Sequence, residues 1–330
     1  MSLLRFCFRK NFFVFRSSVG VGCFSREIST QQTKKLDLRG IFPPITTPFT
    51  SKGSIDFEKL SKNMKRWNEI PFKGYVVQGS NGEYVYLNTS ERIDLVRRVA
   101  HLANDKLIIA GSGCESTAVT IELTRKMASA GANCALVITP SFYKGAMSNA
   151  SFKTHFLKIA DDSPIPILLY NVPVNTGLDL DPNIILELAD HPNIVGLKDS
   201  GGDISKIGNL VFATKNKDFQ ILAGSAGFLY PALMMGCVGG ICALANAMGK
   251  ELCDLQLLYE QGKHEEALEL QQKLIAPNTA VTRKYGVAGL KQAMEWFGFH
   301  GGPPRLPMLP LNREQITELK KEFTTRGFKV

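Results

Sequence analysis

The chain has 330 residues, of which 44% are hydrophobic and 21% are charged, with 39 Lys and Arg residues against 30 Asp and Glu residues. This ordinary globular composition excludes a disordered chain, a collagen-like repeat and a small disulfide scaffold. The formal net charge of +9 is compatible with a nucleic-acid or membrane-surface role, so the distribution of charge along the chain decides whether such a role is plausible.

Most of the positive charge lies in the first 35 residues, which carry a net charge of +6, whereas residues 36–330 carry +3. The segment is rich in Arg, Phe and Ser and contains one acid, Glu27, a composition typical of an organelle presequence. We expect residues 1–35 to direct the protein to the mitochondrial matrix; an ordered N-terminal arm is the alternative. Residues 36–330 contain no basic stripe interleaved with aromatic residues and no uninterrupted apolar run of about 20 residues, so we expect neither a nucleic-acid nor a membrane partner.

The cysteines and histidines lack the spacing of a metal site. The seven cysteines form no CxxC pair, and the five histidines form no HExxH motif. Cys134, Cys237 and Cys242 lie in apolar runs and are interpreted as core residues. The chain also lacks the GxxxxGK[ST] and GxGxxG nucleotide fingerprints. We therefore expect no metal and no cofactor.

From residue 40, short apolar runs alternate with segments of helical period. The runs are 40–49, 74–80, 106–113, 134–140, 166–173, 194–200, 220–225 and 239–246. Most are too continuously apolar for half-exposed strands, which favours a parallel sheet covered by helices. Eight such units predict an α/β fold, a (β/α)8 TIM barrel over residues 36–248. A doubly wound sheet is the alternative, but that fold usually brings a nucleotide fingerprint.

Beyond the eighth run, the chain is polar and helical over 249–276 and 281–297. A Gly/Pro-rich stretch at 298–307 precedes a final helix near 312–325. We interpret residues 249–330 as a C-terminal helical extension packed on the barrel.

In a barrel of this kind the active site forms at the carboxyl ends of the strands. The residues at these ends are mostly hydroxyls, with one lysine and almost no carboxylates. They are Thr46, Thr47, Ser80, Asn81, Ser112, Thr139, Tyr143, Tyr170, Lys198, Ser200, Gly224, Ser225 and Asn246. This set lacks the paired carboxylates of glycoside hydrolysis and the ligands of a metal, and it suits carbonyl chemistry with a lysine nucleophile.

Lys198 ends the apolar run 194–197, so its stem should start inside the barrel. Burial disfavours the ammonium form of a lysine, and a neutral amine can attack a ketone to form a Schiff base. The alternative is a structural lysine paired with Asp199. Tyr170 ends the preceding strand and could shuttle protons, or it could merely make a hydrogen bond there.

The sequence Gly79-Ser80-Asn81-Gly82-Glu83 joins a strand to a helical segment. Small residues at such a junction let backbone N–H groups converge on an anion such as a carboxylate. An ordinary tight turn, with Glu83 capping or pairing locally, is the alternative.

Several motifs together resemble the dihydrodipicolinate synthase / N-acetylneuraminate lyase family of Schiff-base aldolases. They are PPITTPF (43–49), GSNGE (79–83), TPSFYKG (139–145), YNVPVNTG (170–177), GLKDSGG (196–202), AGSAGF (223–228), GGICALAN (239–246) and VAGLKQAMEWFGFHGGPPRLPM (287–308). The resemblance implies that Lys198 forms the Schiff base and that Tyr170 relays protons. It also implies that Ser80 and Asn81 hold the carboxylate of a small 2-oxo acid, and that Ile241 adds a backbone contact. We count Ser80 among the catalytic residues, and expect Ser200 and Gly224 to bind substrate as well.

Within the family, three features favour cleavage of 4-hydroxy-2-oxoglutarate to pyruvate and glyoxylate. The first is the presequence. The second is Ser80-Asn81, where the synthases usually have Thr-Thr, and the third is Asn175, where they usually have an arginine for a second carboxylate. Another aldolase activity of the family remains open, on N-acetylneuraminate, a 2-keto-3-deoxy sugar acid or a dihydrodipicolinate precursor. A non-catalytic 2-oxo acid binder is the alternative outside enzymes.

One position departs from the family pattern. Members often carry a Tyr-Tyr pair after the Thr-Pro, and one phenol reaches into the site of a neighbouring subunit. This chain has Phe142-Tyr143, so Tyr143 can supply that relay only if the second position is the one used. The resemblance further implies a homo-oligomer, a tetramer.

Overall fold

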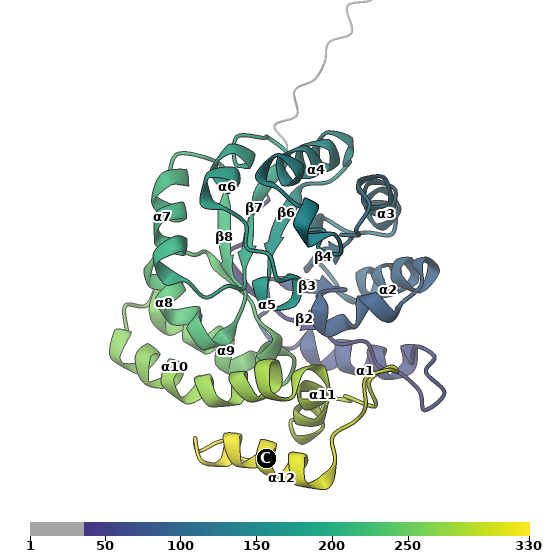
Figure 1. The fold of residues 1–330 in the computed structure, drawn as a ribbon. Helices are drawn as coiled ribbons and strands as arrows, with labels where there is room; N and C mark the ends of the chain where they lie inside the picture. Colours follow the sequence, from purple (N-terminus) through teal and green to yellow (C-terminus); the bar gives the residue numbers. More distant parts are fainter. Residues whose placement is uncertain (1–35) are drawn as a thin grey trace, which may run out of the picture. The chain divides into compact units, whose positions relative to one another are not determined.

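The computed structural model describes residues 36–330, and the presequence predicted for residues 1–35 lies outside the described residues. Nine parallel strands form one sheet in the described chain (Figure 1). They are β1 (Gly40–Phe42), β2 (Pro44–Ile45), β3 (Gly74–Val77), β4 (Leu107–Gly111), β5 (Cys134–Ile138), β6 (Ile167–Asn171), β7 (Ile194–Asp199), β8 (Gln220–Ala223) and β9 (Gly239–Ile241).

The sheet closes through the segment that carries β1 and β2. β1 pairs with β9 and β2 pairs with β3, while Pro43 stands between the two short strands. A proline cannot donate a ladder hydrogen bond, which interrupts the segment there. β1 and β2 are thus two halves of one strand position, and the sheet has eight positions. The predicted (β/α)8 barrel is confirmed, and the doubly wound alternative is wrong.

Helices surround the barrel and bury their apolar faces against it (Figure 1). The helices between the strands are α1 (Phe57–Trp67), α2 (Thr89–Leu102), α3 (Thr117–Ser129), α4 (Asn149–Asp162), α5 (Pro173–Thr176), α6 (Pro182–Leu188), α7 (Ile204–Thr214) and α8 (Leu229–Met234). Side-chain caps fix several helix starts: Asn88, for example, forms a capping box with Glu91 at the start of α2. Gly131 follows the end of α3 with a positive φ of 106°, a conformation that glycine adopts readily.

The chain after the barrel strands is helical: α9 (Gly249–Glu260), α10 (His264–Thr279), α11 (Gly286–Trp296) and α12 (Arg313–Thr324). A turn at Gly262 divides the helical stretch predicted over 249–276 into α9 and α10. The stretch predicted from 281 starts later, because Ala280–Lys284 form a π-helical turn closed by the Tyr285 N–H on the Ala280 carbonyl.

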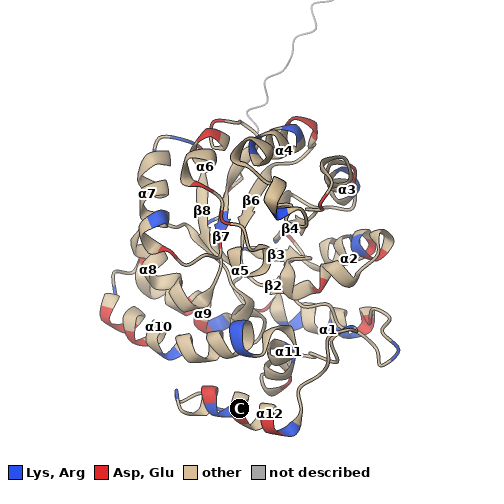
Figure 2. Cartoon of the chain, in the orientation of Figure 1, with Lys and Arg blue, Asp and Glu red and all other residues tan. Residues whose placement is uncertain are grey.

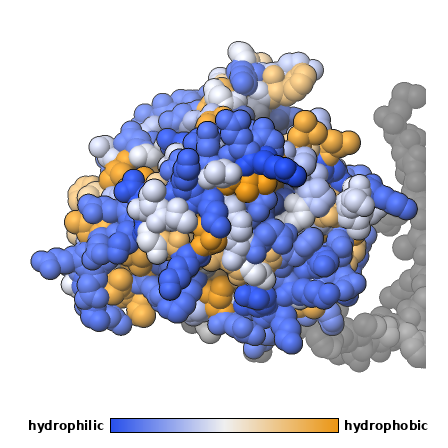
Figure 3. All heavy atoms as spheres, turned by 90° about the horizontal axis from the view of Figure 1, so that it is seen from below, coloured by the Kyte–Doolittle hydropathy of each residue, from blue (hydrophilic) through white to orange (hydrophobic). Residues whose placement is uncertain are grey.

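The surface of the described chain mixes both signs of charge. Figure 2 shows Lys and Arg interspersed with Asp and Glu on the outer helices. On the face seen in Figure 3, hydrophobic spots are separated by hydrophilic side chains. Within residues 36–330, no helix has the length and apolarity needed to cross a bilayer.

Candidate active site

Lys198 and Tyr170 lie side by side at the ends of neighbouring strands. The register of β6 and β7 places Tyr170 opposite Lys198, so both side chains leave the sheet on the same face. The Lys198 Nζ lies 3.9 Å from the centroid of the Tyr170 ring. Both residues are buried, with 2% and 5% of their surface exposed. A primary amine and a phenol therefore share one desolvated space.

Asp199, the next residue along β7, has other partners. Its carboxylate accepts hydrogen bonds from the Asn171 side-chain amide at 2.8 Å and from the Gly201 N–H at 2.9 Å. Successive side chains on a strand point to opposite faces, so Asp199 points away from Lys198. No ion pair joins Lys198 and Asp199 in the described chain, and the alternative of a lysine paired with Asp199 gains no support.

Ser80 joins the pair from a third element. It begins the short 3-10 helix Ser80–Gly82 that follows β3. Its Oγ lies 3.3 Å from the Tyr170 phenol oxygen, at hydrogen-bonding distance. Three of the predicted site residues, Ser80, Tyr170 and Lys198, thus form one connected cluster. Asn81 follows Ser80 in the same turn and is half-buried.

The turn that carries Ser80 and Asn81 is bounded by two residues in the left-handed region. Gln78 has φ 68° and Glu83 has φ 57°, a conformation that L side chains rarely adopt. Arg92 of α2 holds the first: its Nε donates to the Gln78 Oε1 at 2.9 Å and its Nη2 to the Gly111 carbonyl at 2.7 Å. Lys291 of α11 holds the second, with its Nζ 2.6 Å from the Glu83 Oε1.

Sequence reasoning missed both of these cations. A detectable signal existed, because each stands on the apolar face of its helix. Arg92 precedes Leu95, Val96 and Val99 at helical spacing, and Lys291 stands one turn from Val287 and Met294. A charge at such a position requires a buried partner. The sequence could not identify the partner, since Glu83 lies 208 positions before Lys291.

Ser200 and Gly224 extend the site along the ends of β7 and β8. The Ser200 N–H donates to the Asn171 carbonyl at 2.9 Å, and the Gly224 N–H donates to the Asp199 carbonyl at 2.7 Å. A Cβ on Gly224 would lie 2.0 Å from the Ser200 Oγ and 2.6 Å from the Asp199 carbonyl oxygen. Only glycine therefore allows these two strand ends to approach so closely.

Ile241 and Tyr143 lie outside the cluster of Ser80, Tyr170 and Lys198. Ile241 is buried in β9, where it pairs with Phe42. Tyr143 and Phe142 follow β5, with exposed fractions of 72% and 76%, and their rings stack edge to face with centroids 5.0 Å apart. Neither ring interacts with Tyr170 or Lys198 within the described chain.

A second phenol, which the sequence did not suggest, borders the Tyr170 side chain. Tyr84 and Tyr170 line the same small cavity inside the barrel. Burial raises the pKa of Tyr84 to about 12, so this phenol stays protonated at neutral pH. Tyr84 can therefore donate a hydrogen bond there, whereas it is a poor base.

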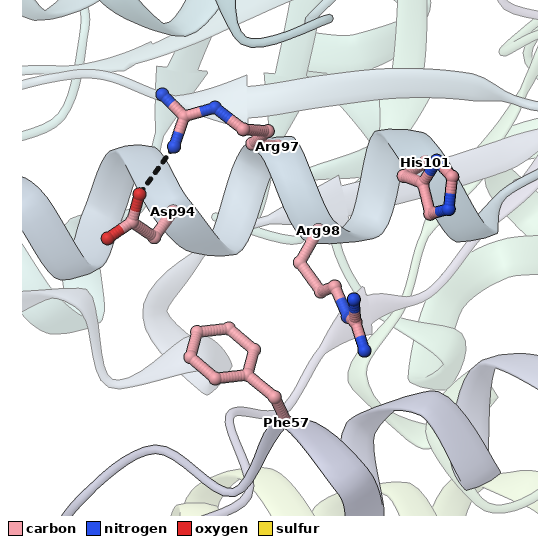
Figure 4. A pocket seen from close by; sticks show the side chains of 5 residues that line it. All are labelled: Phe57, Asp94, Arg97, Arg98 and His101. Atoms are coloured by element: carbon pink, nitrogen blue, oxygen red, sulfur yellow. Dashed lines mark hydrogen bonds and ion pairs between the residues drawn. The ribbon is translucent and has the colours of Figure 1, made fainter.

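A separate hollow lies on the outside of the barrel, between α1 and α2. It has a volume of about 550 Å³ and is lined by Phe57, Asp94, Arg97, Arg98 and His101 (Figure 4). Arg97 is paired with Asp94 at its edge. None of the predicted site residues lines this hollow. Across residues 36–330, no three or more His, Cys, Asp or Glu side chains are grouped so as to hold a metal ion.

A parallel (β/α)8 barrel that places a buried lysine beside a phenol at the carboxyl ends of adjacent strands has the design of a Schiff-base-forming lyase. The sequence model of the dihydrodipicolinate synthetase family matches residues 37–326. The chain therefore belongs to this family, whose members are pyruvate-dependent lyases and aldolases, and it is an enzyme of that class.

Relatives in other organisms support the assignment. The chain is 33% identical to 4-hydroxy-tetrahydrodipicolinate synthase of Methanothrix thermoacetophila over 286 residues, 87% of this chain and 96% of that protein. It is 34% identical to a probable mitochondrial 4-hydroxy-2-oxoglutarate aldolase of Emericella nidulans over 291 residues, 86% of this chain and 94% of that protein. A dihydrodipicolinate synthase crystal structure from Bacillus anthracis superimposes with a TM-score of 0.84 at 28% identity, covering 88% of this chain and 99% of that one.

Proposed function

We propose that the protein cleaves 4-hydroxy-2-oxoglutarate to pyruvate and glyoxylate through a Schiff base on Lys198. The observation that carries the proposal is the connected cluster of Lys198, Tyr170 and Ser80, with the amine 3.9 Å from the phenol ring and the phenol oxygen 3.3 Å from the hydroxyl. An amine nucleophile and a proton relay are the two groups that this chemistry requires.

In the first half of the reaction, the Lys198 amine attacks the C2 ketone of the substrate and forms a C–N bond. The ketone oxygen takes one proton from the amine and one from the Tyr170 phenol and leaves as water, which gives a protonated imine and the Tyr170 phenolate. The Ser80 hydroxyl lies at hydrogen-bonding distance from the Tyr170 oxygen and can donate a hydrogen bond to the phenolate. The low exposure of the amine keeps bulk water away from this intermediate.

In the second half, the Tyr170 phenolate, or a water held by a hydroxyl, removes the proton of the C4 hydroxyl. The C3–C4 bond breaks, its electron pair moves into the imine to form an enamine, and glyoxylate leaves. Protonation of C3 and addition of water then release pyruvate and the free Lys198 amine. The electron balance closes without an oxidant or a reductant.

Ser80 and Asn81 are proposed to hold the C1 carboxylate of the substrate. They supply a hydroxyl and a side-chain amide beside Tyr170, and both can donate hydrogen bonds to a carboxylate. Ser200, Gly224 and the backbone of Ile241 are proposed as further substrate contacts. The glycine at 224 supports this because it leaves the backbone accessible at the ends of β7 and β8.

The choice of substrate rests on residue 175 and on a relative. Asn175 lies in α5 over the centre of the barrel (Figure 1), where an arginine would offer a bidentate site for a second carboxylate. The relative from Emericella nidulans carries the name of a probable 4-hydroxy-2-oxoglutarate aldolase, whereas the other relative carries the synthase name. Asn175 is the feature that favours the aldolase reaction over the synthase reaction.

We further propose that the enzyme works in the mitochondrial matrix as a homotetramer. The support is the basic, acid-poor composition of residues 1–35 and the mitochondrial name of the Emericella nidulans relative. Tyr143 is exposed on the segment after β5, which leaves its phenol available to a neighbouring subunit.

The test is a substrate panel with coupled detection of pyruvate, combined with borohydride trapping. 4-Hydroxy-2-oxoglutarate, N-acetylneuraminate, 2-keto-3-deoxygluconate and pyruvate with aspartate semialdehyde are offered to the wild type. Turnover should be fastest with 4-hydroxy-2-oxoglutarate. Faster turnover of another member of the panel would reassign the substrate, and no turnover of any member would refute the proposed reaction.

Borohydride in the presence of pyruvate should leave a mass adduct on the peptide that carries Lys198. Lys198→Ala should lose the adduct and at least about 10³-fold in rate, because no other group can form the imine. Lys198→Arg is the matched control, because it keeps a long basic side chain at this position but supplies no amine that can form the imine. An adduct on another lysine, or a normal rate in Lys198→Ala, would refute the mechanism.

A further inference from the structure

A buried ion pair joins the C-terminal helices to the turn that carries Ser80 and Asn81. The Lys291 Nζ of α11 lies 2.6 Å from the Glu83 Oε1, and 1% and 0% of the two side chains are exposed. The same Nζ donates to the Pro303 carbonyl at 3.0 Å and lies 4.6 Å from the centroid of the Phe49 ring. Lys291 is thus fixed from three directions.

Glu83 is held equally firmly. Its other carboxylate oxygen accepts a hydrogen bond from the Arg305 backbone N–H at 2.7 Å. Its own N–H donates to the Ser80 carbonyl at 3.2 Å, which closes the turn around Asn81. The Thr47 hydroxyl donates to the Gly82 carbonyl at 2.7 Å. The left-handed conformation of Glu83 is therefore maintained by partners on both sides of the turn.

Net stability does not account for such a pair. Moving two charges out of water costs several kcal/mol per ion, and a well-packed apolar pair of similar volume is often as stable or more stable. A buried pair does define a geometry, because each charge tolerates only one arrangement of its partner. Here the defined geometry is that of the residue three positions after Ser80.

We propose that Glu83 and Lys291 are positioning residues for the carboxylate of the 2-oxo acid, which makes the C-terminal helices part of substrate recognition. The pair fixes the end of the Ser80–Gly82 turn, and the turn presents the Ser80 hydroxyl and the Asn81 amide to the substrate. This inference rests on the proposed function, since it assumes that these two residues receive the carboxylate.

The test compares two ketones that differ in the carboxylate. Pyruvate and acetone both form an imine with an amine, and only pyruvate carries a carboxylate. The measured quantity is the ketone concentration that gives half-maximal borohydride trapping on the Lys198 peptide. In Lys291→Met this concentration should rise about tenfold to hundredfold for pyruvate and change less than about twofold for acetone, because only pyruvate depends on the turn.

Lys291→Met leaves the Glu83 carboxylate buried without a counter-charge and could therefore prevent folding. The double variant E83Q/K291M removes both charges and keeps the side-chain volumes similar. The double variant should fold, and its half-maximal concentration should still rise for pyruvate but not for acetone, because the ion pair between Glu83 and α11 is absent. Lys291→Arg keeps the charge and should restore part of the pyruvate response.

Lys284→Met is the matched control, since Lys284 is an exposed lysine beside α11 that pairs with Glu318 and Glu322. It should trap both ketones as the wild type does. The inference is overturned if the half-maximal pyruvate concentration of the double variant equals that of the wild type. It is also overturned if the half-maximal concentrations of pyruvate and acetone rise together. A wild type that gives no Lys198 adduct with either ketone would instead refute the proposed function.

Discussion

Two parts of the site are positioned by different means. Lys198 and Tyr170 are fixed by backbone register, because β6 and β7 pair directly and place them opposite each other. The turn with Ser80 and Asn81 is fixed by side chains from two helices, Arg92 of the following helix α2 on one side and Lys291 of α11 on the other. Lys198, the proposed nucleophile, thus belongs to the sheet, and the candidate carboxylate site depends on the surrounding helices.

The difference predicts how each part fails. Many hydrogen bonds maintain the pairing of β6 and β7. A substitution of Lys198 or Tyr170 should therefore leave the strands in place and remove only the reacting group. The turn depends on a few buried polar contacts, so removing one of them should shift a whole group of donors. Substitutions in the first part should therefore lower kcat, and those in the second part should raise KM.

The largest effect is expected from Tyr170→Phe. The ring remains beside the Lys198 Nζ, but the phenol oxygen and its contact with Ser80 are lost. The turnover number should fall about 10²–10⁴-fold, as expected for loss of a general acid–base group, and KM should change little. Steady-state kinetics with pyruvate detection measure both. Tyr75→Phe is the control, since Tyr75 is a buried β3 tyrosine that bonds to Asn68. A Tyr170→Phe enzyme with normal turnover would contradict the assigned relay.

Gly224→Ala should act on the strand ends themselves. The new Cβ would lie 2.6 Å from the Asp199 carbonyl oxygen, so the ends of β7 and β8 must separate. We expect a loss of about 1–3 kcal/mol in the free energy of unfolding, together with a lower kcat. Urea denaturation and kinetics test both. Gly145→Ala is the control, because a Cβ there meets open space. Equal effects of the two substitutions would show that the close approach is unimportant.

Arg92→Met should loosen the turn from its other side. The Gln78 Oε1 and the Gly111 carbonyl would each lose a buried donor, at a cost of about 1–3 kcal/mol each. We expect KM for 4-hydroxy-2-oxoglutarate to rise about tenfold with a smaller change in kcat. Arg97→Met, on the same helix, removes a guanidinium from the exposed pair with Asp94 and should leave KM unchanged. A fall in kcat at constant KM would place Arg92 with the chemical step instead.

Substitution of His155 should have the smallest effect on activity, because His155 is buried in α4 away from both parts of the site. Its expected effect is on the pH dependence of the free energy of unfolding. Burial lowers the pKa of His155 to about 4 from an ordinary value of 6.5. As the pH falls, the unfolded chain therefore takes up the proton on His155 before the folded chain does. The free energy of unfolding should be highest above pH 6.5 and should decrease as the pH falls toward 4, by at most about 1.4 kcal/mol per pH unit. Urea denaturation at pH 7 and pH 5 measures this loss. His155→Gln should flatten the dependence; an unchanged slope would assign it to other groups.

The barrel and the position of its strand-end lysine and tyrosine were predictable because their signals are local. Eight apolar runs with the character of a parallel sheet define the strands. Lys198 and Tyr170 are recognisable in the sequence as polar residues at the ends of two of these runs. Consecutive strands of a barrel are neighbours, so their ends meet without further information. The family motifs strengthen that reading over most of the chain.

The supports of the turn were not predictable in the same way. Arg92 and Lys291 lie on apolar helix faces. This pattern indicates that each has a buried partner but does not identify the partner. Tyr84 carries no pattern that separates a site residue from a core residue.

The sequence by itself determined the (β/α)8 fold, the family and the lysine most suited to the chemistry, because strand patterning and motif order are properties of neighbouring residues. Only the tertiary structure decided that the Asn171 amide and the Gly201 N–H bind the Asp199 carboxylate, and that Glu83 meets Lys291 across 208 positions of sequence. The physical reason is that a buried charge pairs with whichever opposite charge the packing brings within reach, and packing joins residues that no local pattern connects.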